Sequence, residues 1–455
     1  MKIIVVGMSN IGSFLVKILS ANPECDVSVI DSNQQEVDKA TDLYNVSGVC
    51  GSGSARSVLM KAGADTADVI VALTPVDEIN ILCCMIAKDC GTRYSSALIH
   101  RPDLVEDTDY FKKLVSIDFV INPRLAAAEE IGLQIGKTGK VKTDAVFGEN
   151  AIMLRTTVEK GGTLDGKSMI DVKRFFSENM LVGTVRRGKK IYIPDGSFVL
   201  KADDEIEIIS AKSSVHSILA SLGLPDIKAD KVLIIGCGTT GYYLANHLLR
   251  LKKSVKIIDR DMERCRRLTE LFPKAEISYI NDADTLMQQD LRSFDACVSL
   301  TGEDDRNLVN SLFAWSSGVR SVITRITSPQ YEKLLRKTDI QITVSPVVTA
   351  AEKLLGFIRN IAFYNEKGDD IGQISLIADG GAEAIEFMAY DNCKALDIPF
   401  SSSDFRLNKD VIIALIIRGG ETIIPDGKSC IKSGDKVIAV TKSGGRYNTL
   451  NEIFR

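Results

Sequence analysis

The stretch that decides the fold is residues 231–259, KVLIIGCGTTGYYLANHLLRLKKSVKIID. An apolar run typical of a β-strand comes first, and glycines at 236, 238 and 241 follow with the spacing G-x-G-x-x-G. A segment with helical spacing then leads to a second strand-like run, which ends in Asp259. In such a unit the glycines allow a tight turn, close approach of the backbone to a pyrophosphate, and packing of the helix. The sequence therefore predicts a nucleotide-binding turn, with the phosphates at the helix N-terminus.

The acid at the end of this unit supports the same prediction. Asp259 lies 18 residues after Gly241, close to where a ribose-binding carboxylate is expected. A carboxylate in that place accepts hydrogen bonds from both ribose hydroxyls and repels a 2′-phosphate, so NADP forms are expected to bind poorly.

The unit occurs a second time at residues 2–31, KIIVVGMSNIGSFLVKILSANPECDVSVID. Gly7 and Gly12 align with Gly236 and Gly241 at an offset of 229 residues, and the final aspartates, 31 and 259, align at 228. The repeat continues through the threonines at 74 and 301, the arginines at 101 and 325, and the I-P-D-G turns at 193–196 and 424–427. A period of about 228 residues is far too long for a solenoid, so the chain is a tandem duplication of two similar halves.

Strand-like and helical segments alternate through residues 1–122 and again through 226–350, which predicts a doubly wound parallel sheet in each. Residues 141–222 and 371–455 instead carry short strand-like runs separated by turns. The fold expected is α/β, with two Rossmann-like domains (1–122 and 226–350), each followed by a small α+β domain (141–222 and 371–455). Residues 137–142 and 365–370 are expected to be links.

Composition restricts the class of protein. The chain of 455 residues is 45% hydrophobic and 25% charged, as is usual for globular proteins, and its net charge of -4 argues against a nucleic-acid surface. No apolar run approaches the roughly 20 residues that span a bilayer. The first residues already form a strand, so no signal peptide is expected and the protein is predicted to be cytoplasmic.

The ten cysteines show no metal-binding spacing, and reduced, mostly buried thiols are the preferred interpretation. Redox sensing at Cys237 is the alternative, because a helix N-terminus lowers the pKa of a thiol. The acidic run Glu303–Asp305 is interpreted as a solvated loop, with a cation site as its alternative.

These motifs resemble those of RCK (KTN) domains, which regulate potassium transport. The resemblance rests on the glycine turns with their acids, the D-E-x-N run at Asp77–Asn80, the arginines at 101 and 325, and the segments Asp204–Ile209 and Asp435–Val440. It covers nearly the whole chain and implies an N-terminal nucleotide-binding RCK domain and a C-terminal RCK domain in each half. It also implies regulatory NAD(H), ATP or ADP, assembly into a homo-tetramer, and a membrane potassium transporter subunit as partner at the inner face of the membrane.

The turns and the resemblance together assign the cofactor-binding residues, and neither assigns a catalytic residue or a metal ligand. The assigned residues are Gly7, Ser9, Asn10, Ile11, Gly12, Asp31, Ser52, Gly53, Thr74 and Arg101 in the first half, and Gly236, Gly238, Thr239, Thr240, Gly241, Asp259, Arg260, Asp282, Ala283, Thr301 and Arg325 in the second. Because Ser9 replaces the second glycine and Ser52 stands opposite Asp282, the second half is expected to hold the better-formed site.

An NAD(P)-dependent oxidoreductase is the competing hypothesis, since the same scaffold serves such enzymes. No acid, base or nucleophile stands in a recognisable constellation in either half. Both kinds of domain are duplicated, whereas a dehydrogenase normally pairs its dinucleotide domain with a dissimilar one. The sequence therefore favours a regulatory binding protein that is not an enzyme.

Overall fold

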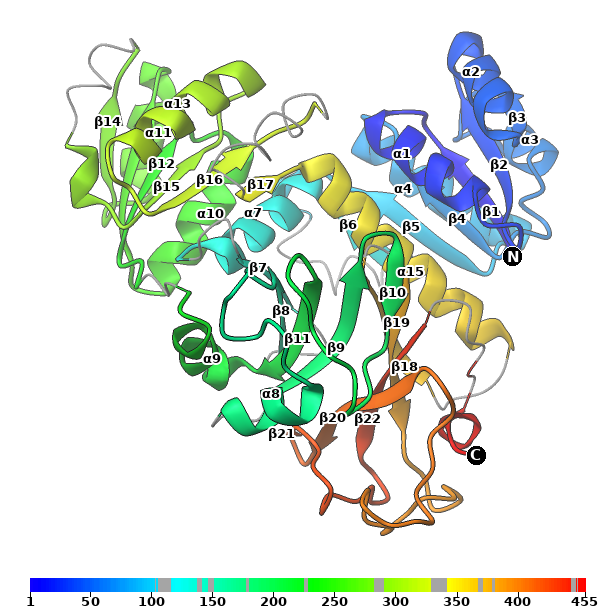
Figure 1. Cartoon of the computed structure of the whole chain (residues 1–455). Helices are drawn as coiled ribbons and strands as arrows, with labels where there is room; N and C mark the ends of the chain where they lie inside the picture. The colour runs from blue at the N-terminus through cyan, green and yellow to red at the C-terminus, as the bar shows by residue number, and fades with distance from the viewer. Residues whose placement is uncertain are drawn as a thin grey trace.

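The computed structural model describes residues 1–102, 104, 116–136, 141–145, 151–176, 180–224, 228–281, 290–328, 342–366, 371–378, 381–442, 447 and 449–455. A parallel sheet with the order β3-β2-β1-β4-β5-β6 forms the centre of the first Rossmann-like unit (Figure 1). Its strands are β1 (Lys2–Val6), β2 (Asp26–Asp31), β3 (Ser47–Cys50), β4 (Val69–Ala72), β5 (Tyr94–Leu98) and β6 (Phe119–Ile121). The helices are α1 (Asn10–Ser20), α2 (Gln34–Tyr44), α3 (Arg56–Lys61), α4 (Asp77–Cys90) and α7 (Pro123–Gln134).

The second Rossmann-like unit repeats this sheet with the order β14-β13-β12-β15-β16-β17. Its strands are β12 (Lys231–Ile235), β13 (Ser254–Asp259), β14 (Glu276–Tyr279), β15 (Ala296–Ser299), β16 (Ser321–Arg325) and β17 (Ile342–Val344). The helices are α10 (Thr239–Arg250), α11 (Met262–Leu271), α13 (Asp304–Ser316) and α15 (Pro346–Glu366), with the 3-10 turn η2 (Leu291–Ser293). In both sheets the strand order reverses beside the glycine turn, which is where such sheets bind ligands. The predicted pair of doubly wound sheets is confirmed.

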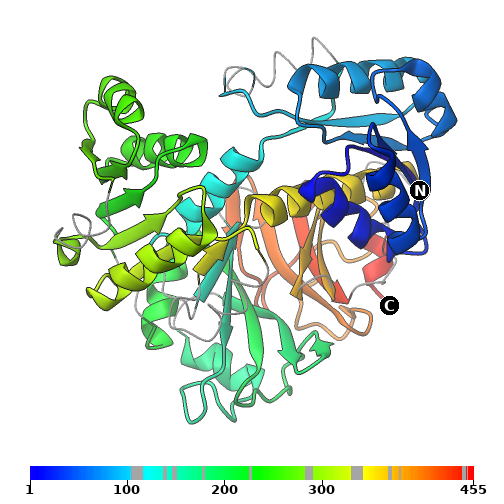
Figure 2. The ribbon, with the colours of Figure 1, turned by 90° about the horizontal axis from the view of Figure 1, so that it is seen from above.

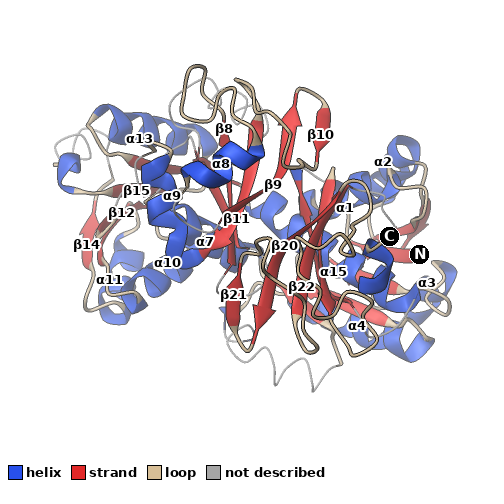
Figure 3. Ribbon diagram, turned by 60° about the horizontal axis from the view of Figure 1, so that its bottom comes forward, coloured by secondary structure: helices blue, strands red, loops and turns tan. Residues whose placement is uncertain are grey.

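Two antiparallel sheets of five strands follow, with the orders β10-β9-β11-β8-β7 and β18-β19-β22-β20-β21. The first contains β7 (Val141–Ala145), β8 (Ala151–Thr157), β9 (Met180–Arg187), β10 (Lys190–Tyr192) and β11 (Glu205–Ala211), with α8 (Met169–Phe175), η1 (Lys212–Ser214) and α9 (Val215–Ser221). The second contains β18 (Ile371–Ile377), β19 (Ala382–Met388), β20 (Val411–Arg418), β21 (Glu421–Ile423) and β22 (Lys436–Lys442), with η4 (Leu450–Ile453). Figure 3 shows these strands in the middle of the molecule, between the two Rossmann-like units.

The two small units differ where the first has α8. Ser168 caps that helix by accepting a hydrogen bond from the Asp171 N–H. In the second half, the residue that corresponds to Ser168, at an offset of 227 residues, is Ala395, which cannot cap a helix with its side chain. Pro399 corresponds to a position inside α8, and the described chain forms turns in this segment instead of a helix. Proline lacks the N–H that a helix interior requires, and alanine is a poor N-cap.

The two antiparallel sheets pack against each other through small and branched side chains. Ala151 and Met153 of the first sheet share one buried cluster with Ala384 and Val440 of the second. A polar group lies at the edge of this apolar contact. Glu207, which is 3% exposed, accepts two hydrogen bonds from the Ala378 N–H, at 2.9 and 3.0 Å. The small domains of the two halves are therefore joined through a mainly apolar interface.

The helices that follow the parallel sheets are exchanged between the halves. α15 belongs by sequence to the second half, yet Ala351, Leu354 and Ile358 lie in the core of the first sheet. Reciprocally, Ala128 and Ile131 of α7 lie in the core of the second. Figure 2 shows α7 (cyan) and α15 (yellow) running through the middle of the molecule, between the two units. Each half thus completes its core with a helix that the other half supplies.

Two ends of the expected links are wrong. The segment 137–142 was expected to be a link, but Val141 already begins β7, whose partner is β8. The second link was expected to start at residue 365, but α15 continues to Glu366. Alternation along only five residues of β7 is too short a pattern to separate a strand from a polar turn.

An ion pair is repeated at the start of the last strand of each antiparallel sheet. Asp204 is fully buried and accepts hydrogen bonds from Arg187 Nε and Nη2, both at 2.7 Å, and from the Lys201 N–H at 2.8 Å. Asp435 makes the same contacts with Arg418, at 2.8 and 2.7 Å. Burial alone raises the pKa of Asp204, but the hydrogen bonds from Arg187 and Lys201 outweigh it and leave this pKa below its usual value.

Replacing Asp204 with asparagine is expected to lower the free energy of unfolding at neutral pH by about 2 kcal/mol, the usual size of a charge-assisted hydrogen bond. Because the folded-state pKa is lowered, the stabilisation is present above the ordinary aspartate range and disappears as the pH falls through the folded pKa. Urea unfolding across this range should show the difference shrinking in acid. The matched control is Asp203→Asn, an exposed neighbour whose φ of +68° asparagine tolerates. An equal loss in both variants would contradict the prediction.

Candidate functional site

Each glycine turn joins the first strand of its sheet to the next helix. Gly236 has a φ of +88°, and a Cβ there would lie 2.9 Å from the Thr301 nitrogen. A Cβ on Gly241 would lie 3.0 Å from the Gly236 oxygen. Side chains at either position would push the turn away from the strand end, so glycine is required for this geometry. Gly7 repeats it in the first half, with a φ of +94°.

The residue at the middle glycine position of the motif differs between the two sites. Gly238 is the N-cap of α10, which has no side-chain cap, and nothing lies within 4 Å of the place a Cβ would take. The first N–H groups of α10 are therefore not occupied by a side-chain cap and can receive an anion. In the first half Ser9 caps α1, because its Oγ accepts a hydrogen bond from the Gly12 N–H at 3.4 Å. That helix end is partly satisfied by its own chain.

The acid at the end of the second strand fixes the turn. Asp259 is 3% exposed, and its Oδ2 accepts from the Cys237 N–H at 2.7 Å while its Oδ1 accepts from the Asp261 N–H at 2.9 Å. Arg264 Nη1 donates to both oxygens, at 3.1 and 3.0 Å. Asp31 repeats the backbone contacts, with the Met8 N–H at 2.7 Å. The carboxylate thus has a structural role beside the ribose-binding role that remains a prediction.

An asparagine holds the threonine at the end of the fourth strand. Asn307 is fully buried, and its Oδ1 accepts from the Thr301 N–H and Oγ1, both at 2.7 Å. Its Nδ2 donates to the Arg325 oxygen at 3.1 Å, which ties two strand ends together. Asn80 does the same for Thr74, at 2.9 and 2.6 Å. This is the asparagine of the D-E-x-N run, which was not among the predicted site residues.

A cavity of about 1190 Å³ lies over the second glycine turn. The second half supplies Gly236, Gly238, Thr239, Thr240, Asp259, Arg260, Thr301 and Arg325 of the predicted residues, together with Asp261, Arg264, Glu303, Arg306 and Asn310. The first half contributes Ile11, His100, Pro123 and Arg124 to the same cavity. Ile11 was predicted for the first site, and the structure places it on the second. A cavity of this size, at a topological switch point, fits a nucleotide.

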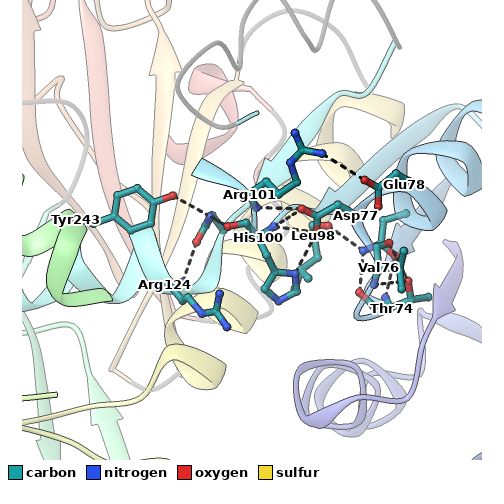
Figure 4. A network of polar contacts seen from close by, with 11 residues as sticks. Thr74, Val76, Asp77, Glu78, Leu98, His100, Arg101, Arg124 and Tyr243 are labelled. Carbon is teal, nitrogen blue, oxygen red and sulfur yellow. Dashed lines mark hydrogen bonds and ion pairs between the residues drawn. The ribbon is translucent and has the colours of Figure 1, made fainter. Parts of the chain in front are cut away.

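A network of hydrogen bonds connects the first half to the α10 helix beside this cavity. Asp77 accepts hydrogen bonds from the His100 N–H, at 2.9 and 3.0 Å, and from the Arg101 N–H at 3.0 Å. Asn122 Nδ2 then donates to the His100 oxygen and to the Tyr243 hydroxyl of α10, at 3.3 and 3.4 Å. Figure 4 shows this network running from the strand ends of the first unit to α10 of the second.

The remaining predicted residues of the first half lie around its own turn. Gly53 is buried, and a Cβ there would lie 2.4 Å from Val6 Cγ1, so this glycine allows the loop to pack on β1. Ser52 Oγ lies 2.8 Å from Ser54 Oγ. Arg101 Nη1 donates to Glu78 at 3.4 Å. Asn10 begins α1 after the Ser9 cap. Asp282 and Ala283 lie outside the described residues.

Burial decides the character of the cysteines. Six of the ten are buried, which agrees with the preferred interpretation, and none of the ten forms a disulfide. Burial raises the pKa of Cys237 to about 12, with the negative charge of Asp259 acting in the same direction. The alternative of redox sensing at Cys237 assumed that the helix N-terminus lowers the pKa of this thiol. That premise is wrong, because burial raises the pKa by more than the helix end lowers it.

The acidic run beside the cavity is engaged in ion pairs and capping contacts. Glu303 pairs with Arg260 at 2.9 Å and with Arg306 at 3.2 Å, and Asp304 accepts from the Ser328 N–H at 2.7 Å. No cluster of ligands suited to a metal ion is found within the described residues. In the same part of the chain, no helix has the length and apolarity needed to cross a membrane.

Comparison with known proteins agrees with this architecture. The TrkA-N domain family matches residues 3–123 and 232–346, and the TrkA-C domain family matches residues 153–223. The chain is 27% identical over 457 residues to the Trk system potassium uptake protein TrkA homolog of Archaeoglobus fulgidus, with all of both chains covered. It is 28% identical over 470 residues to TrkA of Haemophilus influenzae, covering 100% of this chain and 99% of that protein.

Two solved structures share the fold. The RCK domain of GsuK superposes with a TM-score of 0.60 at 17% identity, covering 97% of this chain and 92% of that one. The GsuK channel bound to NAD gives a TM-score of 0.61 at 16% identity, covering 97% and 77%. Matches to the TrkA-N domain at both glycine turns and full-length similarity to TrkA proteins lead to one conclusion. The chain belongs to the TrkA family of RCK-domain proteins.

Proposed function

We propose that this chain is a nucleotide-binding regulatory subunit that gates a potassium uptake transporter of the Trk type. The observation that carries the proposal is the cavity over the second glycine turn, which both halves line. A ligand that contacts both walls binds best when the halves are correctly placed, so it shifts the equilibrium between domain arrangements. The relatives named as Trk potassium uptake proteins support the transporter as the target.

The ligand is proposed to be NAD(H), ATP or ADP. The open helix end at Gly238 suits a phosphate, and Asp259 stands where a ribose lies in such folds. The solved GsuK channel bound to NAD shows a nucleotide ligand on a protein of the same fold. The four domains are proposed to divide at the boundaries predicted from the sequence, with the ligand acting on the Rossmann-like domains.

The partner is proposed to be a TrkH-like transporter subunit, which holds this protein at the inner face of the membrane. The deciding experiment measures potassium uptake by membrane vesicles that contain the transporter, with and without the purified chain. Adding ATP, ADP, NAD or NADH should change uptake only when the chain is present, and the same ligand should raise its melting temperature. If adding the chain leaves potassium uptake unchanged with each of the four nucleotides, the proposal is refuted.

The oxidoreductase hypothesis keeps one supporting observation, which is His100 on the cavity wall with its Nδ1 at 3.1 Å from Asp77. That aspartate also accepts backbone hydrogen bonds, so it serves to order the strand end as well. Steady consumption of NADH or NADPH with a small carbonyl substrate would restore the hypothesis.

Equivalent helices of the two halves expose apolar side chains. Leu82 and Met85 of α4 are 45% and 44% exposed, and the equivalent Val309 and Leu312 of α13 are 55% and 37% exposed. Trp315 continues the row on α13 at 45%. Paired apolar rows on a protein surface are typical of association sites. We propose that these rows join copies of the chain into the expected ring.

Replacing Met85 and Leu312 together with glutamate is expected to reduce the assembled form to smaller species, since buried unpaired charges strongly disfavour an interface. Light scattering at micromolar concentration is the measurement. Leu43→Glu, on α2 and 70% exposed, is the matched control and should leave the mass unchanged. A natural protein that is already monomeric would remove the basis of the prediction.

A further inference from the structure

A buried acid of the first small unit (β7–β11) holds a turn of the second (β18–β22). Residues 378–381 join β18 to β19, and the Ala378 N–H donates to both carboxylate oxygens of Glu207, at 2.9 and 3.0 Å. Both residues are buried, and Ala378 has a φ of +52°, which residues other than glycine seldom adopt. The carboxylate therefore fixes the backbone at the start of this turn.

The first small unit prepares the carboxylate for this contact. Arg155 Nε and Nη2 donate to Glu207 Oε1 at 3.0 and 2.7 Å, and Thr184 Oγ1 donates to Oε2 at 2.6 Å. These two residues lie opposite Glu207 on the neighbouring strands β8 and β9. A buried carboxylate is stable only when such donors surround it. The N–H of the second unit completes a set of donors that the first unit has already oriented.

The other end of the turn also depends on the first small unit. A Cβ on Gly381 would lie 1.9 Å from Ile191 Cδ1 of β10, and Figure 1 shows β10 beside β19. The φ of Gly381 is not in the left-handed region, so the contact and not the backbone requires glycine here. The turn is thus gauged at one end by a carboxylate and at the other by an apolar side chain.

The second small unit does not offer the same receiving surface. The strands of the two units align at an offset of 231 residues, so Ile438 stands where the first unit has Glu207. Ile438 is fully buried and has no hydrogen-bond acceptor in its side chain. A second unit paired with a copy of itself would leave the Ala378 N–H without an acceptor in apolar surroundings, which costs free energy.

The first small unit does not offer the same turn. At the same offset, Phe147 corresponds to Ala378 and Asn150 corresponds to Gly381. A bulky phenylalanine disfavours a φ of +52°, and an asparagine side chain would occupy the space of Ile191. A first unit paired with another copy of itself would therefore lose both contacts. Each surface matches the turn of the other kind of unit.

We propose that Glu207 and Ile191 select the partner of the first small unit, accepting the β18–β19 turn of a second unit and rejecting another first unit. Apolar surfaces alone tolerate several packings, whereas a buried polar group that needs one particular donor restricts them. In an assembly of several copies, this selection keeps every first unit on a second unit. Glu207 acts through the turn that it orders, so it is a positioning residue.

The first experiment measures hydrogen exchange in the full chain by mass spectrometry, in the peptide that contains Ala378. Glu207→Ile introduces the residue of the second unit and removes the acceptor, so exchange there should become about 10- to 100-fold faster. Glu207→Gln keeps one acceptor oxygen and should have a smaller effect. The matched control is Glu205→Gln, an exposed acid on the same strand, which should leave this peptide unchanged.

The second experiment tests the rejection of the other turn. Gly381→Asn introduces the residue of the first unit and should also accelerate exchange in the Ala378 peptide, because the side chain meets Ile191. In an Ile191→Ala background the side chain has room, so the same substitution should cost at least about tenfold less protection. A general loss of stability would not be rescued in this way.

Equal exchange in the Glu207→Ile and Glu205→Gln chains would overturn the inference. So would an effect of Gly381→Asn that Ile191→Ala does not reduce. Should Glu207→Ile fail to fold, the Glu207→Gln chain takes its place in the same comparison.

Discussion

Replacing Leu354 with alanine is expected to lower the free energy of unfolding by about 3–5 kcal/mol, and to loosen the first half of the chain although the residue belongs to the second. Leu354 is fully buried in a cluster with Val5, Leu15 and Val71 of the first sheet and its helix. The cavity left by the substitution lies inside that core. Hydrogen exchange followed by mass spectrometry should show faster exchange in β1, β4 and α1.

The reciprocal substitution is the control. Ile131 of α7 is fully buried in the core of the second sheet, with Val232 and Leu244. Ile131→Ala should therefore increase exchange in β12 and α10 while leaving β1 protected. Faster exchange confined to the half that carries each substitution would show that the helices are not exchanged in solution.

Replacing Asp259 with alanine is expected to weaken nucleotide binding at the second site about 10- to 150-fold, corresponding to the roughly 1.5–3 kcal/mol of one charge-assisted hydrogen bond. The substitution removes the proposed ribose acceptor, and the Cys237 N–H loses the partner that holds the turn. NADPH should already bind the natural protein more weakly than NADH, because the carboxylate repels a 2′-phosphate. Calorimetry on the full chain with ATP, ADP, NAD and NADH measures these effects.

Two variants separate the roles of this carboxylate. Asp259→Asn keeps an acceptor for the Cys237 N–H and removes the charge, so its affinity should lie between those of the natural protein and Asp259→Ala. Asp31→Ala makes the equivalent change in the first half and should leave the second site nearly unaffected. Unchanged affinity after Asp259→Ala, or tighter binding at the first site than at the second, would show that the roles are misassigned.

The parallel sheets could be predicted closely from the sequence. The alternation of strand-like and helical segments expected through residues 1–122 and 226–350 agrees with the two six-stranded parallel sheets, and the glycine spacing placed both turns. Buried parallel strands are short apolar runs between turns, and the spacing of glycines reflects local backbone geometry. Both the apolar runs and the glycine spacing are local features of a few consecutive residues, so they can be recognised in the sequence alone.

The composition of the second site could not be predicted in full. Helical periodicity identifies an apolar face on α7 and α15, but it does not say which core that face enters. The same limit hid Arg124 and His100, since a residue that lines a cavity from a distant segment carries no local pattern. Asn80 was visible as part of the D-E-x-N run, and its buried contacts with Thr74 explain why that run contains an asparagine.

The exchanged helices give the chain the arrangement of a symmetric dimer whose two subunits have been fused. In a symmetric dimer every substitution appears on both sides of the axis, so both ligand sites must change together. Fusion removes that constraint: a mutation in the codon for residue 124 alters one cavity and leaves the other as it was. The two predicted sites of a single chain are thus free to evolve different ligand specificities.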